Sequence, residues 1–177
     1  MLPLAAYAVT GRAFQEEGIL GSTSWGLHLG EDVLADPDTP VLAIGDGQVV
    51  YAALHPGSSH RGNWGNIIIL GHAHAADAQS FFSVYGHLGE CFVKPDERVS
   101  RGATLGPVGK GRTPGNGYWP EPHLHFAIYR GPWEGKVLPG YFREEDGRTK
   151  LEYWVSPSQF VREYLERPLR ARPVDCD

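Results

Sequence analysis

The sequence contains little cysteine: only Cys91 and Cys176 occur among its 177 residues. Small folds that depend on disulfides use more cysteines in a shorter chain, so this fold must depend on an apolar core. The two cysteines are far apart and lack the paired spacing of a structural zinc site. Whether they pair with each other stays open from the sequence.

Long hydrophobic runs are missing as well, and no stretch approaches the roughly 20 apolar residues of a membrane span. Residues 1–13 contain no basic residue ahead of their short apolar run, so no export signal is visible. With Met1 as the true start, the sequence therefore predicts a cytoplasmic protein. Positive charge is also scarce, because 16 Lys and Arg stand against 21 Asp and Glu, for a formal net charge of -5. This balance argues against a nucleic-acid partner.

Glycine and proline, in contrast, are abundant, with 23 and 14 residues. They interrupt the chain so often that many short strands are favoured over long helices. A chain of this length with 41% hydrophobic residues predicts one compact unit, which we expect to be a monomer. One helix is predicted after Ser156 as N-cap and Pro157 at the first helical position, ending before Pro168. The predicted strands cover residues 41–52, 66–70, 80–88, 91–94 and 123–130.

Two histidines occupy the last predicted strand, in the run HLHFAIY at 123–129. Because a strand sends alternate side chains to opposite faces, His123 and His125 share one face while the apolar residues 124, 126 and 128 share the other. Two such histidines can serve one metal site, or one can bind the metal while its neighbour handles protons. Two solvated histidines are the alternative, and the pair by itself does not decide between them.

A second candidate is the run HLGED at 28–32, which places an imidazole and a carboxylate four residues apart. Both groups suit zinc, and a catalytic zinc site takes three protein ligands and leaves one position open. The spacing of His28 and Asp32 is weak evidence by itself. Together with His123 and His125 it supplies one group more than three, which leaves a histidine for catalysis.

A third candidate is His87, in the run SVYGHL at 83–88. Alternation predicts that Val84 and Leu88 face the core and that Tyr85 and His87 lie on the opposite face. A single histidine of this kind is usually structural or merely exposed. His87 is a functional candidate only because the other candidate residues accompany it in the sequence.

Taken in order, these runs resemble the lysostaphin-type zinc endopeptidases, also called M23 or LytM-like peptidases. The resemblance covers most of residues 24–130 and implies a peptidase domain over 24–166, after a lead-in at 1–23 and before a tail at 167–177. It implies a mainly β, sandwich-like fold with an antiparallel sheet, a narrow groove, long loops and a short C-terminal helix. The matching stretches are HLGED at 28–32, TPVLAIGDGQVVYA at 39–52, GNIIILGH at 65–72, YGHL at 85–88, VSRGATLGPVG at 99–109 and PHLHF at 122–126.

The same resemblance implies roles for five residues. His28, Asp32 and His125 would hold one Zn²⁺, and His87 and His123 would flank it as proton-transfer and oxyanion groups. The implied activity is hydrolysis of peptide bonds in peptidoglycan cross-links, or in other extended peptides with small residues such as Gly or Ala near the cut. Peptidoglycan lies outside the cytoplasmic membrane, which conflicts with the missing export signal and leaves the compartment open.

Aromatic residues are expected to line the groove, namely Trp64, Tyr85, Tyr118 and Trp119. The loop at 113–122 is longer than the short turn common in the family, so we expect it to remodel one wall of the groove. The other histidines, at positions 55, 60, 72 and 74, are expected to be surface residues.

The main alternative is a catalytically silent LytM-like module that binds wall peptide or activates another hydrolase. Such relatives typically lack one or more metal ligands, whereas all five positions are intact here. A cupin-type metal protein would need a further histidine downstream, and none follows His125.

Overall fold

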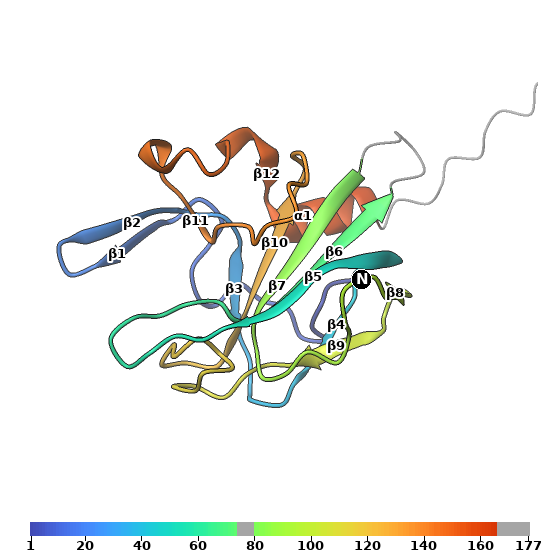
Figure 1. Cartoon of the computed structure of the whole chain (residues 1–177), viewed down its shortest axis with the longest axis horizontal. Coiled ribbons are helices and arrows are strands. Elements are labelled where there is room, and N and C mark those ends of the chain that lie inside the picture. Colours follow the sequence, from blue (N-terminus) through green and yellow to red (C-terminus); the bar gives the residue numbers. More distant parts are fainter. Residues whose placement is uncertain (74–79, 166–177) are drawn as a thin grey trace, which may run out of the picture.

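The computed structural model describes residues 1–73 and 80–165 of the chain. Within these residues the molecule is built mainly of antiparallel strands (Figure 1). The elements are β1 (Glu17–Leu20), β2 (Thr23–His28), β3 (Glu31–Leu34), β4 (Pro40–Leu42), β5 (Gly47–His55), β6 (Gly65–Ala73), β7 (Ser80–Leu88), β8 (Arg98–Val99), β9 (Thr104–Pro107), β10 (His123–Tyr129), β11 (Tyr141–Phe142), η1 (Glu144–Asp146), η2 (Leu151–Tyr153), β12 (Trp154–Val155), α1 (Pro157–Phe160) and η3 (Val161–Leu165).

A seven-stranded sheet forms the centre of the molecule, in the order β12-β10-β7-β6-β5-β8, with β3 pairing on β10. Its long strands β5, β6, β7 and β10 lie side by side in Figure 1. Both faces of this sheet are covered. In β6, Ile68 and Leu70 point into one buried cluster, while Ile67 and Ile69 point into the other. A strand that is buried on both faces has a continuous apolar sequence, as β6 has in the run IIIL at 67–70.

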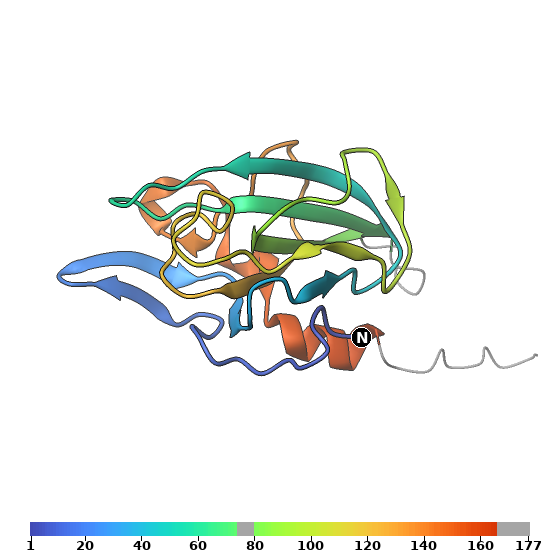
Figure 2. The ribbon, with the colours of Figure 1, turned by 90° about the horizontal axis from the view of Figure 1, so that it is seen from below.

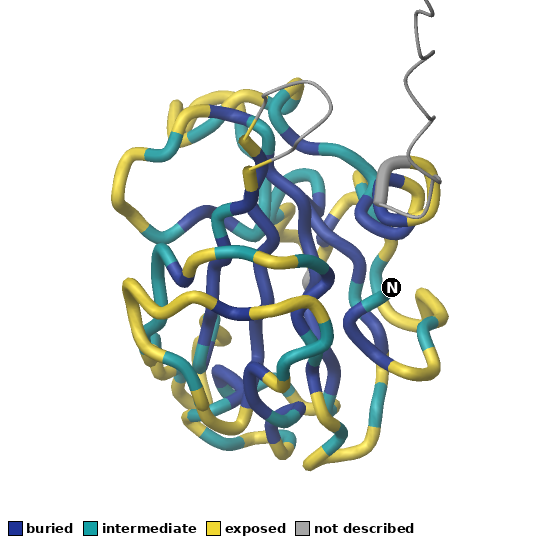
Figure 3. Tube along the Cα trace, turned by 90° about the vertical axis from the view of Figure 1, so that its right-hand side faces the viewer, coloured by how far each residue is buried: buried dark blue, intermediate teal, exposed yellow. Residues whose placement is uncertain are grey.

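The larger cluster lies on the face covered by the β4–β9 ribbon, the N-terminal residues and α1. Figure 2 shows α1 and the N-terminus on the same side of the molecule. The smaller cluster contains Ala127 and Tyr129 of β10. Since His123 and His125 alternate in phase with these two residues, the histidines lie on the face of the smaller cluster. Figure 3 shows the buried residues running through the middle of the trace.

A second, three-stranded sheet in the order β1-β2-β11 lies at the end of the main sheet where the candidate residues gather. Hairpin β1–β2 projects from the body in Figure 1, and β11 pairs with β2 so that Tyr141 lies opposite His28. The residues before this hairpin belong to the fold: Leu4 is buried in the larger cluster, and the Pro3 carbonyl accepts a hydrogen bond from Leu42 N. The predicted boundaries of the lead-in, domain and tail stay predictions, and the tail lies outside the described residues.

The predicted fold class is confirmed: the sheets are antiparallel and a short helix follows them near the C-terminus. The predicted strands at 80–88 and 123–130 correspond to β7 and β10. The strand predicted at 41–52 divides at residues 43–46 into β4 and β5, because the chain bends at residues 44–46. The strand predicted at 91–94 is wrong, since these residues form bends.

The predicted helix begins at Pro157 as expected, but Ser156 makes no capping hydrogen bond. Its hydroxyl group instead donates to the Glu31 carboxylate at 3.3 Å. After one turn of α-helix the chain continues as the π-helical turn η3. Across residues 1–73 and 80–165, none of the helices has the length and apolar character needed to cross a membrane.

Candidate metal centre

The three predicted metal ligands meet where β2, β3 and β10 adjoin. His28 ends β2, Asp32 lies in β3, and the antiparallel pairing of β3 with β10 places Asp32 directly opposite His125. The turn between the first two ligands needs glycine at Gly30. A Cβ atom there would lie 2.5 Å from His125 Nε2 and 2.7 Å from the Phe126 carbonyl oxygen. The bend of the His-x-Gly-x-Asp segment therefore exists because His125 packs against it.

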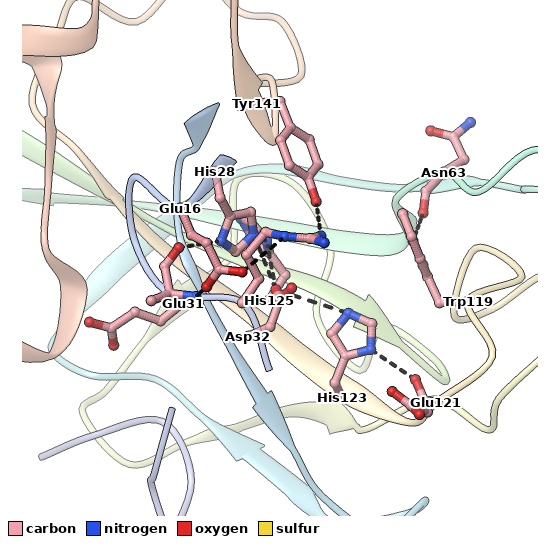
Figure 4. A network of polar contacts seen from close by, with 12 residues as sticks. Glu16, His28, Glu31, Asp32, Asn63, Trp119, Glu121, His123, His125 and Tyr141 are labelled. Atoms are coloured by element: carbon pink, nitrogen blue, oxygen red, sulfur yellow. Dashed lines mark hydrogen bonds and ion pairs between the residues drawn. The ribbon is translucent and has the colours of Figure 1, made fainter. Parts of the chain in front are cut away.

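The ligand atoms converge on one point (Figure 4). His28 Nε2 lies 2.9 Å from His125 Nδ1 and 3.3 Å from Asp32 Oδ1, and His125 Nδ1 lies 3.1 Å from the same oxygen. Tetrahedral zinc with bonds of about 2.0–2.1 Å separates its ligand atoms by about 3.3 Å. The three side chains therefore fit a zinc ion with only small adjustments.

Hydrogen bonds from the preceding chain hold two of the ligands. His28 Nδ1 donates to the Ala13 carbonyl oxygen at 3.1 Å, which leaves the Nε2 lone pair directed at the other two ligands. Asp32 N donates to the Arg12 carbonyl oxygen at 2.8 Å, and Gly11 N donates to the Asp32 carbonyl oxygen at 3.0 Å. Residues 11–13 thus act as a brace behind the candidate metal centre.

The electrostatics keep two of the three ligands deprotonated. Burial raises the pKa of Asp32, but the hydrogen bonds and charges of His125 and His28 outweigh it and hold this pKa well below its usual value. Burial lowers the pKa of His125 to about 4, against the opposing effect of its hydrogen bond to Asp32. A metal binds an ionised carboxylate and a neutral imidazole, and Asp32 and His125 supply these two groups near neutral pH.

His123 and His87 lie beside the three ligands. His123 Nδ1 donates to the Glu121 carbonyl oxygen at 2.8 Å, and its Nε2 faces Asp32 Oδ1 at 4.0 Å (Figure 4). The rings of His87 and His123 are 4.6 Å apart between centroids. Burial lowers the pKa of His87 well below its usual value, and His87 Nδ1 has no hydrogen-bond partner among the described residues.

Tyr85 does not share the face of His87, contrary to expectation. It is fully buried in the larger cluster, and its hydroxyl oxygen accepts a hydrogen bond from Ile44 N. The cause is a β-bulge: Gly86 and His87 together oppose the single residue Ile67 of β6, and His87 has a φ of 65°. The extra residue reverses the alternation, so His87 turns toward the metal ligands. Glycine inside a strand pattern was the signal in the sequence for this bulge.

Two of the predicted groove residues contact the site. The Trp64 ring lies 4.8 Å from the His125 ring and 5.7 Å from the His87 ring. Trp119 lies 5.8 Å from the His87 ring, and its indole N–H donates to the Asn63 carbonyl oxygen. Tyr118 lies in the same loop with a left-handed backbone, at φ 66°, and is half-buried.

The sequence did not predict three residues on the other side of His28. The Tyr141 ring is 5.2 Å from the His28 ring, and its hydroxyl group accepts a hydrogen bond from Arg12 Nη1 at 2.8 Å. Trp25 contacts both Tyr141 and Trp119, with ring centroids 5.6 and 5.5 Å apart. No local pattern links these residues to the motif, because strand pairing and loop packing bring them together.

Three further histidines are described, and none of them belongs to the group of metal-binding side chains. His72 is buried, so its prediction as a surface residue is wrong: its Nδ1 donates to the Asp46 carbonyl oxygen and its Nε2 contacts the Ser83 hydroxyl at 2.7 Å. His60 is exposed as predicted, and half-buried His55 bonds to Tyr51. His74 lies outside the described residues.

The fold and the site together define a mainly β protein with a His-His-Asp metal centre at one end of its antiparallel sheet. The model of peptidase family M23 matches residues 26–137. The chain belongs to this family, and the match contains all three ligands.

Individual relatives agree with this assignment. The chain is 33% identical over 102 residues to the peptidoglycan DD-endopeptidase ShyA of Vibrio cholerae serotype O1, covering 57% of this chain and 20% of that protein. Peptidoglycan DD-endopeptidase ShyC of the same organism is 34% identical over 101 residues, with the same coverage. The chain thus spans only a fifth of the length of these relatives.

Solved structures show the same architecture. The catalytic domain of lysostaphin from Staphylococcus simulans superimposes with a TM-score of 0.55 at 25% identity, over 86% of this chain and 90% of that one. A zinc-containing peptidase from Vibrio cholerae has a TM-score of 0.56 at 25% identity, over 72% of this chain and 35% of that one.

Proposed function

We propose that this protein is a zinc-dependent endopeptidase that hydrolyses peptide bonds in peptidoglycan cross-links or in peptides containing Gly or Ala. The observation that carries the proposal is the convergence of His28, Asp32 and His125 on one point, with interatomic distances of 2.9–3.3 Å. Membership of peptidase family M23 and the names of the DD-endopeptidase relatives support the substrate class.

His28, Asp32 and His125 would hold the metal. When bound there, zinc supplies Lewis-acid polarisation of the substrate carbonyl and lowers the pKa of water toward neutrality. The chain contributes the brace that fixes His28 and Asp32, and the buried surroundings that strengthen every charge interaction in the site.

His123 accepts the proton of the attacking water at its Nε2 atom and passes it to the leaving amine as the C–N bond breaks. The Nδ1 atom is committed to the Glu121 carbonyl oxygen, so the lone pair lies on Nε2, on the side that faces Asp32. The neutral His87 donates a hydrogen bond to the carbonyl oxygen as negative charge develops on it.

The surroundings favour small residues at the scissile bond. His28 and His125 are 1% and 3% exposed, the Trp64 ring contacts the His125 ring, and the Trp119 ring contacts the neighbouring His87. A scissile carbonyl can approach such a deep site only when the flanking side chains are small. Extended Gly- or Ala-containing peptides meet this requirement.

The test measures metal content and peptide cleavage on the same protein. The wild type should hold close to one zinc per chain and release defined products from purified cell walls or Gly/Ala peptides, identified by mass spectrometry. His28→Ala, Asp32→Ala and His125→Ala should each lose the metal, whereas His60→Ala, an exposed histidine, should keep it. Full zinc content in all three ligand variants would overturn the site. A zinc-loaded protein that binds cell wall but cuts none of these substrates would instead be a silent wall-binding module.

A further inference from the structure

Arg12 is a basic residue built into the candidate metal centre, and the proposed hydrolysis does not use it. Its backbone is fixed against a metal ligand, because Asp32 N donates to the Arg12 carbonyl oxygen at 2.8 Å. The next residue, Ala13, holds the second ligand through His28 Nδ1. The position of Arg12 is therefore set by the same short segment that sets His28 and Asp32.

Two aromatic rings hold the guanidinium group on the His28 side of the site. Arg12 Cζ lies 5.8 Å from the Trp25 ring centroid and 5.9 Å from the Tyr141 ring centroid. Its Nη1 donates to the Tyr141 hydroxyl, which points toward the metal ligands in Figure 4. Since the Tyr141 ring is 5.2 Å from the His28 ring, the positive charge lies next to the metal centre.

The guanidinium group retains unused hydrogen-bonding capacity. It has five N–H donors in a planar fork, and Nε is buried without a hydrogen-bond partner among the described residues. Glu16 Oε1 lies 3.7 Å from Nε, which is an ion-pair contact but too long for a hydrogen bond. The Asp32 Oδ1 atom is already shared by His28 and His125. The Arg12 side chain is 24% exposed although its Nε is buried, so a ligand approaches the guanidinium group at its outer atoms.

We propose that Arg12 is a carboxylate-binding subsite beside the metal centre, which selects peptides that carry a carboxylate close to the scissile bond. This proposal rests on the proposed peptidase function. A planar guanidinium held beside two aromatic rings matches a carboxylate in two parallel hydrogen bonds, a geometry that lysine cannot reproduce. The carboxylate belongs either to the C-terminus of the substrate or to an acidic side chain next to the cut.

Cleavage kinetics separate these two sources. Three short Gly/Ala peptides would be compared: one with a free C-terminal carboxylate, its C-terminal amide, and an amide with an aspartate beside the scissile bond. In the wild type, kcat/KM should be about tenfold or more higher for at least one acid than for the neutral amide, mainly through KM. Whichever acid shows this gain identifies the source of the carboxylate.

Variants of Arg12 test whether the preference for acidic over neutral peptides depends on its guanidinium group. Arg12→Gln should bring kcat/KM for the acid and for the neutral amide to nearly the same value while the zinc content stays at the wild-type level, and Arg12→Lys should retain only part of the difference. Arg98→Gln, which changes an exposed arginine of β8, should behave as wild type. If Arg12→Gln does not fold, Arg12→Lys carries the test, and an unchanged acid preference in that variant overturns the proposal.

A binding measurement tests the carboxylate subsite independently of the proposed peptidase activity. Calorimetry on the zinc-loaded proteins would compare N-acetylglycine with its amide as probes. The wild type should favour the acid, and this preference should fall about tenfold in Arg12→Gln. Absence of peptide cleavage together with this binding result would refute the peptidase and leave the subsite intact. Equal acid preference in wild type and Arg12→Gln, or an equal loss of acid and amide binding, would overturn the subsite.

Discussion

At the scale of single residues, the histidines of the site differ in the atoms that their ring nitrogens contact. His28 and His125 direct one nitrogen each at the Asp32 carboxylate, at 3.3 and 3.1 Å. His123 uses Nδ1 for the Glu121 carbonyl, and its Nε2 stays 4.0 Å from the same carboxylate. These distances support the proposal that the first two are metal ligands and the third a proton acceptor.

This division predicts different consequences for the two kinds of histidine. His123→Ala and His87→Ala should keep the wild-type zinc content and fold but lose about two orders of magnitude or more in kcat, because proton-transfer and oxyanion groups act on that scale. Metal analysis and steady-state kinetics on the same preparations check the prediction. Wild-type turnover in either variant would refute the role of that residue.

His72 predicts a pH dependence of stability that is separate from the metal site. It is buried between the Asp46 carbonyl and the Ser83 hydroxyl, and burial lowers its pKa. The unfolded chain, where a histidine has a pKa of about 6.5, therefore takes up a proton that the folded state resists. Stability should be complete above about pH 6.5 and fall as the pH is lowered below it.

Thermal melts in saturating zinc, from neutral pH down into the acid range, would measure this effect. His72→Gln keeps hydrogen-bonding groups but cannot titrate, so its melting temperature should fall less steeply with pH than that of the wild type. His60→Gln, at an exposed position, should keep the wild-type slope. Identical slopes for wild type and His72→Gln would show that His72 does not contribute.

At the scale of elements, the loop at 113–122 is fixed by its contact with the segment before β6. Asn63 N donates to the Gly117 carbonyl oxygen, and Asn66 N donates to the Gly115 carbonyl oxygen at 2.6 Å. The loop carries Trp119 to His87 and leads directly into β10 at His123. The loop is thus tied to the residues on either side of Trp64, next to the candidate metal centre.

Gly117 offers a sharp test of this contact. Its φ is 72°, and a Cβ atom there would lie 1.9 Å from the Asn63 carbonyl oxygen. Gly135 has the same φ, but no atom lies within 4 Å of an added Cβ atom. Gly135→Ala therefore measures the free-energy cost of the strained backbone without a steric clash. Gly135→Ala should cost about 1 kcal/mol of unfolding free energy, and Gly117→Ala clearly more.

Denaturant unfolding of both variants measures the difference. Because the displaced loop also moves Trp119, Gly117→Ala should raise KM for peptides while its zinc content stays at the wild-type level. Equal costs for the two variants would mean that the two segments separate easily, and that the loop does not form a fixed wall.

At the scale of the whole molecule, Glu31 ties three distant segments together behind the metal centre. It is 4% exposed, and its carboxylate accepts hydrogen bonds from Tyr7 Oη at 2.6 Å and from Ser158 Oγ at 2.9 Å. These contacts join the N-terminal residues and α1 to β3, on the face of β3 opposite Asp32. The centre is therefore supported from the reverse side of its own strand.

Glu31→Ala should lower the free energy of unfolding by about 2–4 kcal/mol, since it leaves several buried donors without an acceptor. For a chain of this size, that corresponds to a fall in melting temperature of roughly 5–15 °C. Calorimetry of this variant beside Glu134→Ala, an exposed glutamate, checks the prediction. A melting temperature equal to that of the control would refute the role of Glu31.

The sequence by itself determined the strand class of the fold, and its resemblance to the M23 peptidases implied the metal ligands. Local rules supplied the candidates for that resemblance: two-residue alternation in β10 sets His123 and His125 on one face, and His28 and Asp32 lie four residues apart around Gly30. These rules act over a few residues and can be read without the rest of the chain.

Only the tertiary structure decided which other residues reach the site. Tyr85 and His87 lie on opposite faces of the sheet because a bulge at Gly86 and His87 shifts the alternation of side chains. His72 is buried between segments that no local pattern connects. Arg12 and Tyr141 are 129 residues apart in the sequence, and the pairing of β11 with β2 together with the packing of residues 11–13 against β3 brings them together. The free energy of such contacts depends on packing between distant segments, which residue spacing along the chain does not encode.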